Sequence, residues 1–243
     1  MPISRIFQAI PLAVNTQIIL DNQASHHVAR VLRAKVSDEV VIFNGEGGEF
    51  LGTITHIDKK NVTVSLTTFD AREAESTLHL TLAQGISRGE KMDYTIQKAV
   101  ELGVNRIVPL LTERCNVKLD DERRQKRFQH WQSIVVSACE QSGRNRLPEI
   151  LAPQALTTWL PTVQADQGFV LAPGAERSLQ HFSLEKSAHI VLLIGPEGGL
   201  SQAEITQSQR YGFAPLALGP RILRTETAAV AALTALQCCF GDI

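Results

Sequence analysis

The sequence predicts an α/β protein: a larger C-terminal domain built on a mostly parallel sheet, preceded by a small β-rich domain. Three observations support this fold class. Short runs of alternating apolar residues fill positions 38–69, strands and helices alternate from residue 78 onward, and two glycine-bearing turns directly follow buried strands. Alternating strands and helices are typical of a parallel sheet covered on both faces.

The composition is that of a folded globular protein. The chain has 243 residues, of which 44% are hydrophobic and 20% are charged. It contains no apolar run of about 18 residues, and its start, MPISRIFQAIPLAV, does not resemble a secretory signal. We therefore expect a soluble, cytoplasmic protein with no membrane partner.

Cysteine spacing and charge limit the classes of site. The cysteines at positions 115, 139, 238 and 239 form no CxxC pair and have no histidine at ligand spacing, so we expect no metal and no disulfide framework. The net charge is -1, although residues 1–36 and 84–130 each carry an excess of Lys and Arg. This bias suits phosphate contacts, but ordinary solvated faces explain it equally well.

In the first domain the apolar pattern predicts one helix and three strands. The helix covers residues 24–34, and the strands cover 39–43, 49–57 and 61–69, with tight turns at NGEGG and DKK. The polar segment 71–76 shows neither the alternation of a strand nor the apolar period of a helix. We place the boundary there, which gives a first domain of residues 1–70 and a second of residues 77–243.

In the second domain, segments with the apolar pattern of a strand alternate with segments that have the pattern of a helix. Strands are expected at 78–84, 106–111, 168–173, 189–195 and 214–219, and helices at 88–104, 202–211 and from 226 towards 240. Ligand sites in such sheets lie at the carboxyl ends of the strands. The two glycine-bearing turns fall at those ends.

The first turn, GPEGGLSQAEI, contains the signals of a helix start. Ser201 and Glu204 form a capping box, and Leu200 and Ile205 fit a hydrophobic staple. A plain tight turn would explain any one glycine here. Three glycines that allow a ligand to approach bare backbone, next to a carboxylate, favour a binding site: Gly195, Gly198, Gly199 and Glu197.

The common nucleotide motifs are missing from the chain. It has no GxGxxG after its first strand and no GK[ST] loop, so a dinucleotide or triphosphate ligand is not supported. The turns could instead bind an adenine edge through their backbone, with apolar side chains against its faces: Ile194, Leu218, Ile222 and Leu223.

The second turn, LGPRILRTETAAVAAL, combines loop arginines with a helix start. Thr225 is expected to cap the helix, and Glu226 suits its positive end. Arg221 and Arg224 have no such structural role, so we expect Glu197, Glu226 or an RNA phosphate to pair with them. The alanine-rich face that follows suits close packing, either internal or across a dimer.

Several segments together carry a family resemblance. They are SRGEKMDYTIQKAVELGV, ACEQSGRNRLPEI, LLIGPEGGLSQAEI and LGPRILRTETAAVAAL, with RIFQ and HHVARVLRA near the start. On these segments the chain resembles ribosomal RNA small subunit methyltransferase E, the 16S rRNA uridine-N3 methyltransferases of the SPOUT class. The resemblance extends over nearly the whole chain.

The resemblance implies an N-terminal PUA-like RNA-binding β-barrel, a C-terminal SPOUT domain with a trefoil knot, and an obligate homodimer. It also implies S-adenosylmethionine as methyl donor and uridine 1498 of 16S rRNA, in the small ribosomal subunit, as target. The cofactor would lie against Leu171, Ile194, Gly195, Gly199, Leu218, Gly219, Ile222 and Leu223.

The chemistry of uridine N3 suggests roles for the polar residues. The base must be unpaired and turned into the site, and its N3 proton must leave. Either Glu197 or Glu226 could accept the proton, while Arg224, with Arg221 in reserve, could stabilise the charge on O2 and O4. The expected RNA contacts are basic residues of both domains: Arg5, His27, Arg30, Arg33, Arg88 and Lys91.

Two other functions fit the same sequence. A non-catalytic RNA-binding or ribosome-assembly factor would suit the β-rich front domain and the uneven charge, but it has no need of both glycine-bearing turns. A methyltransferase of the same architecture acting on tRNA, or at another uridine position, would need them.

Overall fold

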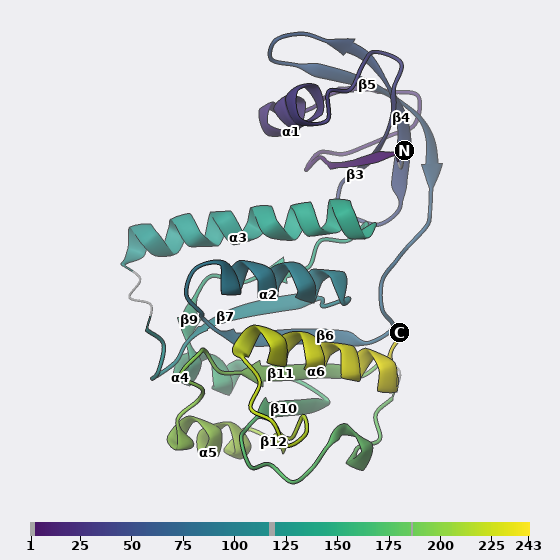
Figure 1. The fold of residues 1–243 in the computed structure, drawn as a ribbon. Helices are drawn as coiled ribbons and strands as arrows, with labels where there is room; N and C mark the ends of the chain where they lie inside the picture. The colour runs from purple at the N-terminus through teal and green to yellow at the C-terminus, as the bar shows by residue number, and fades with distance from the viewer. Residues whose placement is uncertain (1–2, 117–119, 186) are drawn as a thin grey trace. The chain divides into compact units, whose positions relative to one another are not determined.

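The computed structural model describes residues 3–116, 120–185 and 187–243, which form two compact units (Figure 1). The first unit comprises Met1–Glu75 and Cys139–Leu147, and the second comprises Ser76–Ala138 and Pro148–Ile243. The sequence analysis assigned residues 139–147 to the second domain, whereas their contacts group them with the first unit. The limits 1–70 and 77–243 stay a prediction.

The first unit contains a five-stranded sheet. Its strand order is β1 (Ser4–Phe7), β3 (Glu39–Phe43), β4 (Glu49–Ile57), β5 (Val62–Asp70) and β2 (Gln17–Ile19). β1 pairs with β3 in parallel, and the other pairs are antiparallel. The three expected strands are confirmed within one residue, because alternation at period two is a local signal. The short β1 and β2 were not predicted.

The helix of the first unit differs from its prediction. It begins as α1 (Asn22–His26), where the Asp21 carboxylate accepts a hydrogen bond from Ala24 N at 2.8 Å, and continues as one π-helical turn, η1 (His27–Val31). The expected limits, 24–34, are therefore wrong at both ends. Arg33 adopts a φ of +54°, which is incompatible with a continuing right-handed helix.

Residues 139–147 bring a buried cation into the first unit. Arg144 is 3% exposed, and its Nε donates to Glu75 Oε1 at 3.1 Å. The neighbouring Asn145, fully buried, donates to Arg72 O at 2.7 Å. A buried guanidinium requires a paired, hydrogen-bonded environment, and Glu75 supplies the opposite charge.

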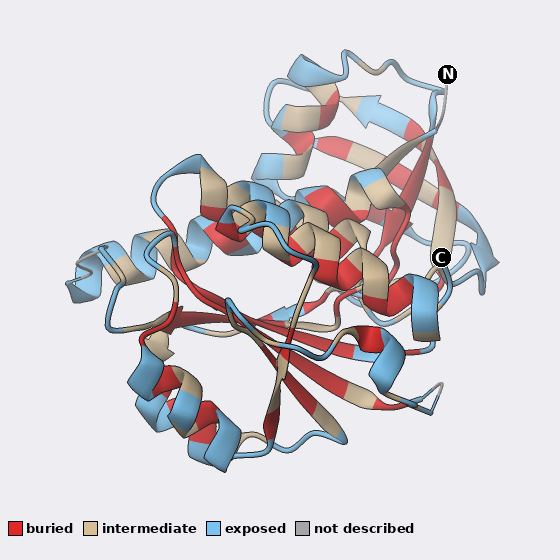
Figure 2. Cartoon of the chain, turned by 60° about the horizontal axis from the view of Figure 1, so that its bottom comes forward, coloured by how far each residue is buried: buried red, intermediate tan, exposed pale blue. Residues whose placement is uncertain are grey.

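The second unit is built on a parallel sheet, as predicted. Its order is β12 (Phe213–Leu216), β10 (Gln167–Leu171), β11 (His189–Ile194), β6 (His79–Gly85), β7 (Arg106–Leu111) and β8 (Glu149–Ile150), with β9 (Gln154–Ala155) also paired to β7. All of these pairs are parallel. The central strands are buried along nearly their whole length (Figure 2), which explains their continuous apolar runs.

Helices cover this sheet. α2 (Glu90–Glu101) and α6 (Thr225–Phe240) lie side by side (Figure 1), and α5 (Gln202–Arg210) packs on β12 and β10. Short helical turns lie between β9 and β11: α4 (Leu156–Trp159), η2 (Leu160–Thr162) and η3 (Leu179–His181). The long α3 (Asp121–Ser142) was not predicted, because its charged first half obscures the apolar period.

The described residues contain neither a membrane-spanning helix nor a metal-binding cluster. No helix in this part of the chain is both long and apolar enough to cross a membrane. In the same ranges no group of three or more His, Cys, Asp or Glu side chains is placed to hold a metal ion.

The buried pair predicts a measurable contribution to stability. Replacing Glu75 by Gln removes the charge opposite Arg144, and we expect the free energy of unfolding to fall by about 3 kcal/mol in urea titrations. The control is Glu122→Gln, which removes the partner of Lys126 in an exposed pair and should cost at most about 0.5 kcal/mol. Equal effects of the two substitutions would contradict the role of Arg144 burial.

Candidate active site

A cavity of about 890 Å³ lies in the second unit, where the carboxyl ends of β10, β11 and β12 meet. This is the edge at which a parallel sheet is expected to bind ligands. Its walls include both glycine-bearing turns and the start of α6. All eight residues expected to contact a cofactor line it: Leu171, Ile194, Gly195, Gly199, Leu218, Gly219, Ile222 and Leu223.

The first turn is compact because its glycines lack side chains. A Cβ on Gly195 would lie 2.6 Å from Leu200 N and 2.7 Å from Gly199 C, both of them backbone atoms. Gly199 adopts a φ of +70°, and its N–H donates to Pro196 O at 2.8 Å. Gly195 thus permits close backbone approach, and Gly199 provides a left-handed conformation.

The predicted capping box of α5 is confirmed. Ser201 N donates to Glu204 Oε2 at 2.8 Å, and Glu204 N donates to Ser201 Oγ at 3.3 Å. Glu204 is 7% exposed, and its other oxygen accepts a hydrogen bond from Glu113 N at 2.8 Å. One carboxylate therefore joins the helix start to the segment after β7.

Glu197 projects from the first turn towards basic neighbours. It accepts a hydrogen bond from Arg88 N at 3.0 Å, and its Oε1 lies 3.6 Å from Lys91 Nζ. Partial burial works to raise its pKa, but the backbone hydrogen bonds and Lys91 outweigh that effect, so the pKa lies below its ordinary value. Glu197 is therefore ionised at neutral pH.

The start of α6 differs from the prediction. Arg224, with extended backbone angles, occupies the N-cap position, and Thr225 is the first helical residue. The expected cap by Thr225 is therefore wrong: its hydroxyl donates to Gly195 O at 2.6 Å instead. Glu226 does lie in the first turn, as expected, and its Oε2 is buried with no hydrogen-bond partner within the described ranges.

The second turn presents its charges to solvent. Arg221 and Arg224 line the cavity and are exposed, and neither forms an ion pair with any described residue. Glu197, one of the three partners expected for them, lies beside Lys91 instead. Glu226 forms no ion pair with them in the described part of the chain, and an RNA phosphate as their partner stays a prediction. Ile222 also lines the cavity, but it is 89% exposed and lies at its rim.

The expected RNA contacts fall into two groups. In the first unit Arg30 and Arg33 are exposed and His27 is half-buried, while in the second unit Arg88 is exposed and Lys91 lines the cavity. Each unit thus presents basic side chains to solvent.

Arg5 differs from the other expected contacts. Its side chain is 13% exposed, pairs with Glu49 at 2.5 Å and donates to Asn145 Oδ1. Its guanidinium also lies 5.1 Å from the centre of the Phe43 ring. Arg5 thus has partners inside the unit, and a phosphate contact by this residue stays a prediction. The RIFQ segment alone could not reveal these distant partners.

The sequence analysis missed two residues that hold the first turn. Gln84, at the end of β6, donates to Gly195 O, and Arg114 Nη1 donates to Gly198 O at 3.2 Å. A signal for Gln84 existed: it is a polar residue at the carboxyl end of a buried apolar strand, LTLAQ. Arg114 lies in an exposed loop and offered none.

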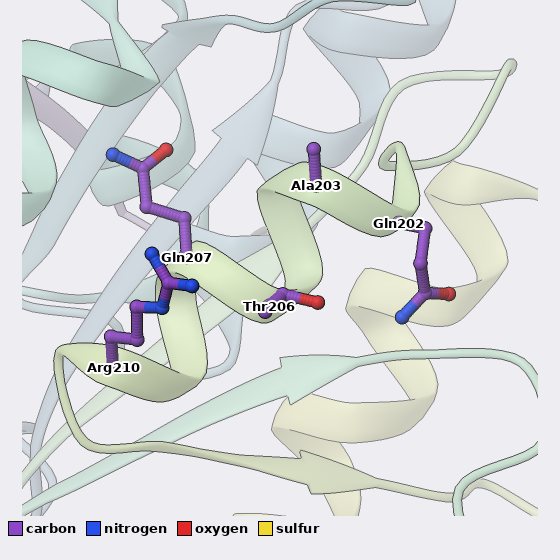
Figure 3. Close-up of a pocket in the computed structure, with 5 residues that line it drawn as sticks. All are labelled: Gln202, Ala203, Thr206, Gln207 and Arg210. Atoms are coloured by element: carbon purple, nitrogen blue, oxygen red, sulfur yellow. The ribbon is translucent and has the colours of Figure 1, made fainter.

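A second hollow lies on the outer face of α5 (Figure 3). All the residues that line it come from that one helix: Gln202, Ala203, Thr206, Gln207 and Arg210. Their side chains project outward in different directions rather than converging. Because no other element contributes to it, this surface carries no candidate site.

Family models match most of the chain. A family model for an RNA methyltransferase domain matches residues 74–237, and one for an RNA methyltransferase PUA domain matches residues 20–67. Ribosomal RNA small subunit methyltransferase E of Buchnera aphidicola subsp. Schizaphis graminum is 41% identical and aligns over 99% of this chain and 98% of its own length. Its Bacillus subtilis counterpart is 31% identical over 87% of this chain and 86% of its own.

Solved structures extend the match to the whole fold. A Neisseria gonorrhoeae ribosomal RNA small subunit methyltransferase E bound to S-adenosyl methionine has a TM-score of 0.92 and 36% identity, covering 99% of each chain. A Legionella pneumophila protein described as a methyltransferase, in complex with SAM, has a TM-score of 0.97 and 39% identity, covering 100% of each. The fold is thus that of an RNA methyltransferase. The chain belongs to the ribosomal RNA small subunit methyltransferase E family.

Because the first turn is tight, we expect two alanine substitutions in it to lower the free energy of unfolding by different amounts. Gly195→Ala places a methyl group against backbone and should lower the free energy of unfolding by about 3 kcal/mol. Gly199→Ala meets no atom within 4 Å and should cost about 1 kcal/mol, for its positive φ alone. Urea unfolding measures both. A larger loss for Gly199→Ala would refute this account of the turn.

Proposed function

We propose that the protein transfers a methyl group from S-adenosylmethionine to N3 of a uridine in 16S rRNA, the uridine at position 1498 by family resemblance. The observation that carries this proposal is the convergence of all eight expected cofactor residues on one cavity at the carboxyl edge of the sheet. Full-length similarity to ribosomal RNA small subunit methyltransferases E supports the substrate class.

The residues present fit this cofactor. Apolar side chains and bare glycine backbone suit an adenine ring, and Glu226 Oε2, which has no partner within residues 3–116, 120–185 and 187–243, suits a cationic ligand. When bound, S-adenosylmethionine supplies an electrophilic methyl group on a sulfonium centre. The chain's own residues must then orient the uridine and accept its N3 proton.

The two candidate bases differ in their surroundings. Glu197 is held ionised by Arg88 N and Lys91, and its lowered pKa makes it a weak proton acceptor. Glu226 has an oxygen without a partner among the described residues. This difference favours Glu226 as the general base, with Glu197 as the alternative.

Arg224 is proposed to act as the electrophilic group that stabilises negative charge on the uridine. It is exposed at the cavity, and no described acidic side chain neutralises it. A guanidinium in this state can stabilise the negative charge that spreads to O2 and O4 as N3 loses its proton. Arg221, on the same loop, is the reserve candidate.

The remaining parts of the proposal concern RNA and assembly. We assign phosphate contacts to basic residues of both units: His27, Arg30, Arg33, Arg88 and Lys91. The trefoil knot, the homodimer and a cytoplasmic location belong to the proposal through the family resemblance. No metal takes part in it.

The experiment that tests this function is tritium transfer from labelled S-adenosylmethionine to small-subunit RNA lacking the modification. We expect incorporation into 16S rRNA, with 3-methyluridine at one position when the product is mapped by mass spectrometry. Label in tRNA or at another uridine position would support the related methyltransferase instead. Tight RNA binding without transfer would support an assembly factor.

Arg224→Ala should separate catalysis from cofactor binding. Because the charge it stabilises develops only during the reaction, we expect turnover to fall about 100-fold while the Kd for S-adenosylmethionine changes less than about threefold. Arg221→Ala is the matched control on the same loop and should lower turnover less. Equal losses of turnover and cofactor affinity in Arg224→Ala would rule out its electrophilic role.

A further inference from the structure

A buried hydrogen-bond cluster joins the two turns that form the cavity. Thr225 Oγ1 donates to Gly195 O at 2.6 Å, and Gln84 Nε2 donates to Thr225 Oγ1 at 2.9 Å. Gln84 Nε2 also lies 3.3 Å from Gly195 O and 3.0 Å from Gly85 O. Gln84 is 1% exposed and Thr225 is 7% exposed, so both side chains are buried.

The direction of each bond follows from the chemistry. Gly195 O and Gly85 O can only accept, and the single hydroxyl proton of Thr225 is directed at Gly195 O. The side chain facing these three acceptors must therefore be a donor, which fixes the amide of Gln84 with its nitrogen towards them. Its two N–H groups are shared among three acceptors, while Gln84 Oε1 has no partner in the described part of the chain.

The backbone around Gly85 leaves no room for a side chain at that position. A Cβ on Gly85 would lie 2.5 Å from Pro196 N, so the end of β6 and the first turn are in direct backbone contact. Of the two side chains in the cluster, Thr225 lines the cavity and Gln84 does not. Gln84 therefore acts on the cavity only through Thr225 and Gly195.

We infer that Gln84 and Thr225 are a positioning pair: together they set the spacing between the GPEGG turn and the start of α6, and so determine cofactor affinity. This inference rests on the proposed function, because it takes S-adenosylmethionine as the ligand of the cavity. The pair makes the bonded atoms of the two turns a fixed unit before the ligand binds. A preorganised site loses less conformational entropy on binding.

The test measures S-adenosylmethionine affinity by isothermal titration calorimetry on the full chain. Thr225→Val keeps the shape of the side chain and removes its hydroxyl, and Gln84→Met removes the amide. Each should raise the Kd about tenfold or more, equivalent to about 1.4 kcal/mol. The double variant should bind S-adenosylmethionine as tightly as the weaker-binding single variant, because both substitutions break the same cluster. Thr225→Ser, which keeps the hydroxyl, should restore the wild-type Kd.

A matched control separates positioning from general stability. Gln237 is another buried amide of the same unit: it is 1% exposed, and its Nε2 donates to Leu102 O at 2.8 Å. Gln237→Met should lower the melting temperature as much as Gln84→Met but change the Kd less than about twofold. Thr225→Ala, which introduces no new group, replaces Thr225→Val if that variant folds poorly.

The outcomes are distinct. A tenfold loss in both single variants, restored by serine, supports the positioning pair. An unchanged Kd in Thr225→Val and Thr225→Ala, with wild-type protein binding normally, refutes the pair and leaves the proposed function intact. Failure of the wild-type protein to bind S-adenosylmethionine contradicts the proposed function, and the inference falls with it.

Discussion

A hydrogen bond from the Thr225 hydroxyl to the Gly195 carbonyl joins two walls of the cavity at the carboxyl edge of the second unit's sheet. The two residues are 30 positions apart: Gly195 lies in the first turn, and Thr225 is the first residue of α6. Glycine at position 195 also allows the backbone of the first turn to fold tightly against Leu200 N. Contacts between distant segments thus bring the first turn and the start of α6 to one cavity.

Burial divides the polar residues at this edge into two kinds. Gln84 and Thr225 are inside, where the Gln84 amide N–H groups and the Thr225 hydroxyl offset part of their desolvation through hydrogen bonds. Arg221 and Arg224 are outside, where a guanidinium needs no protein partner. The buried groups thus join segments of the unit, whereas the two arginines present their charges to solvent.

The sequence missed the partners of three polar residues for a common reason. Thr225 was expected to cap the helix, Arg5 to contact RNA, and Glu197, Glu226 or an RNA phosphate to pair with the loop arginines. Each assignment used neighbours in the sequence or charge alone. The structure gives each of the three residues a partner far along the chain: Gly195 for Thr225, Glu49 for Arg5, and Lys91 for Glu197.

The sequence by itself determined the alternation of strands and helices, the capping box at Ser201 and the positions of both glycine-bearing turns. These features depend on periodicity and on backbone preferences within a few residues. Only the tertiary structure decided that Gln84 and Thr225 meet at Gly195, and that Arg144 is buried beside Glu75. Such contacts join distant segments, so no local pattern encodes them: they exist only once the strands have paired and the carboxyl ends of the sheet lie at one edge.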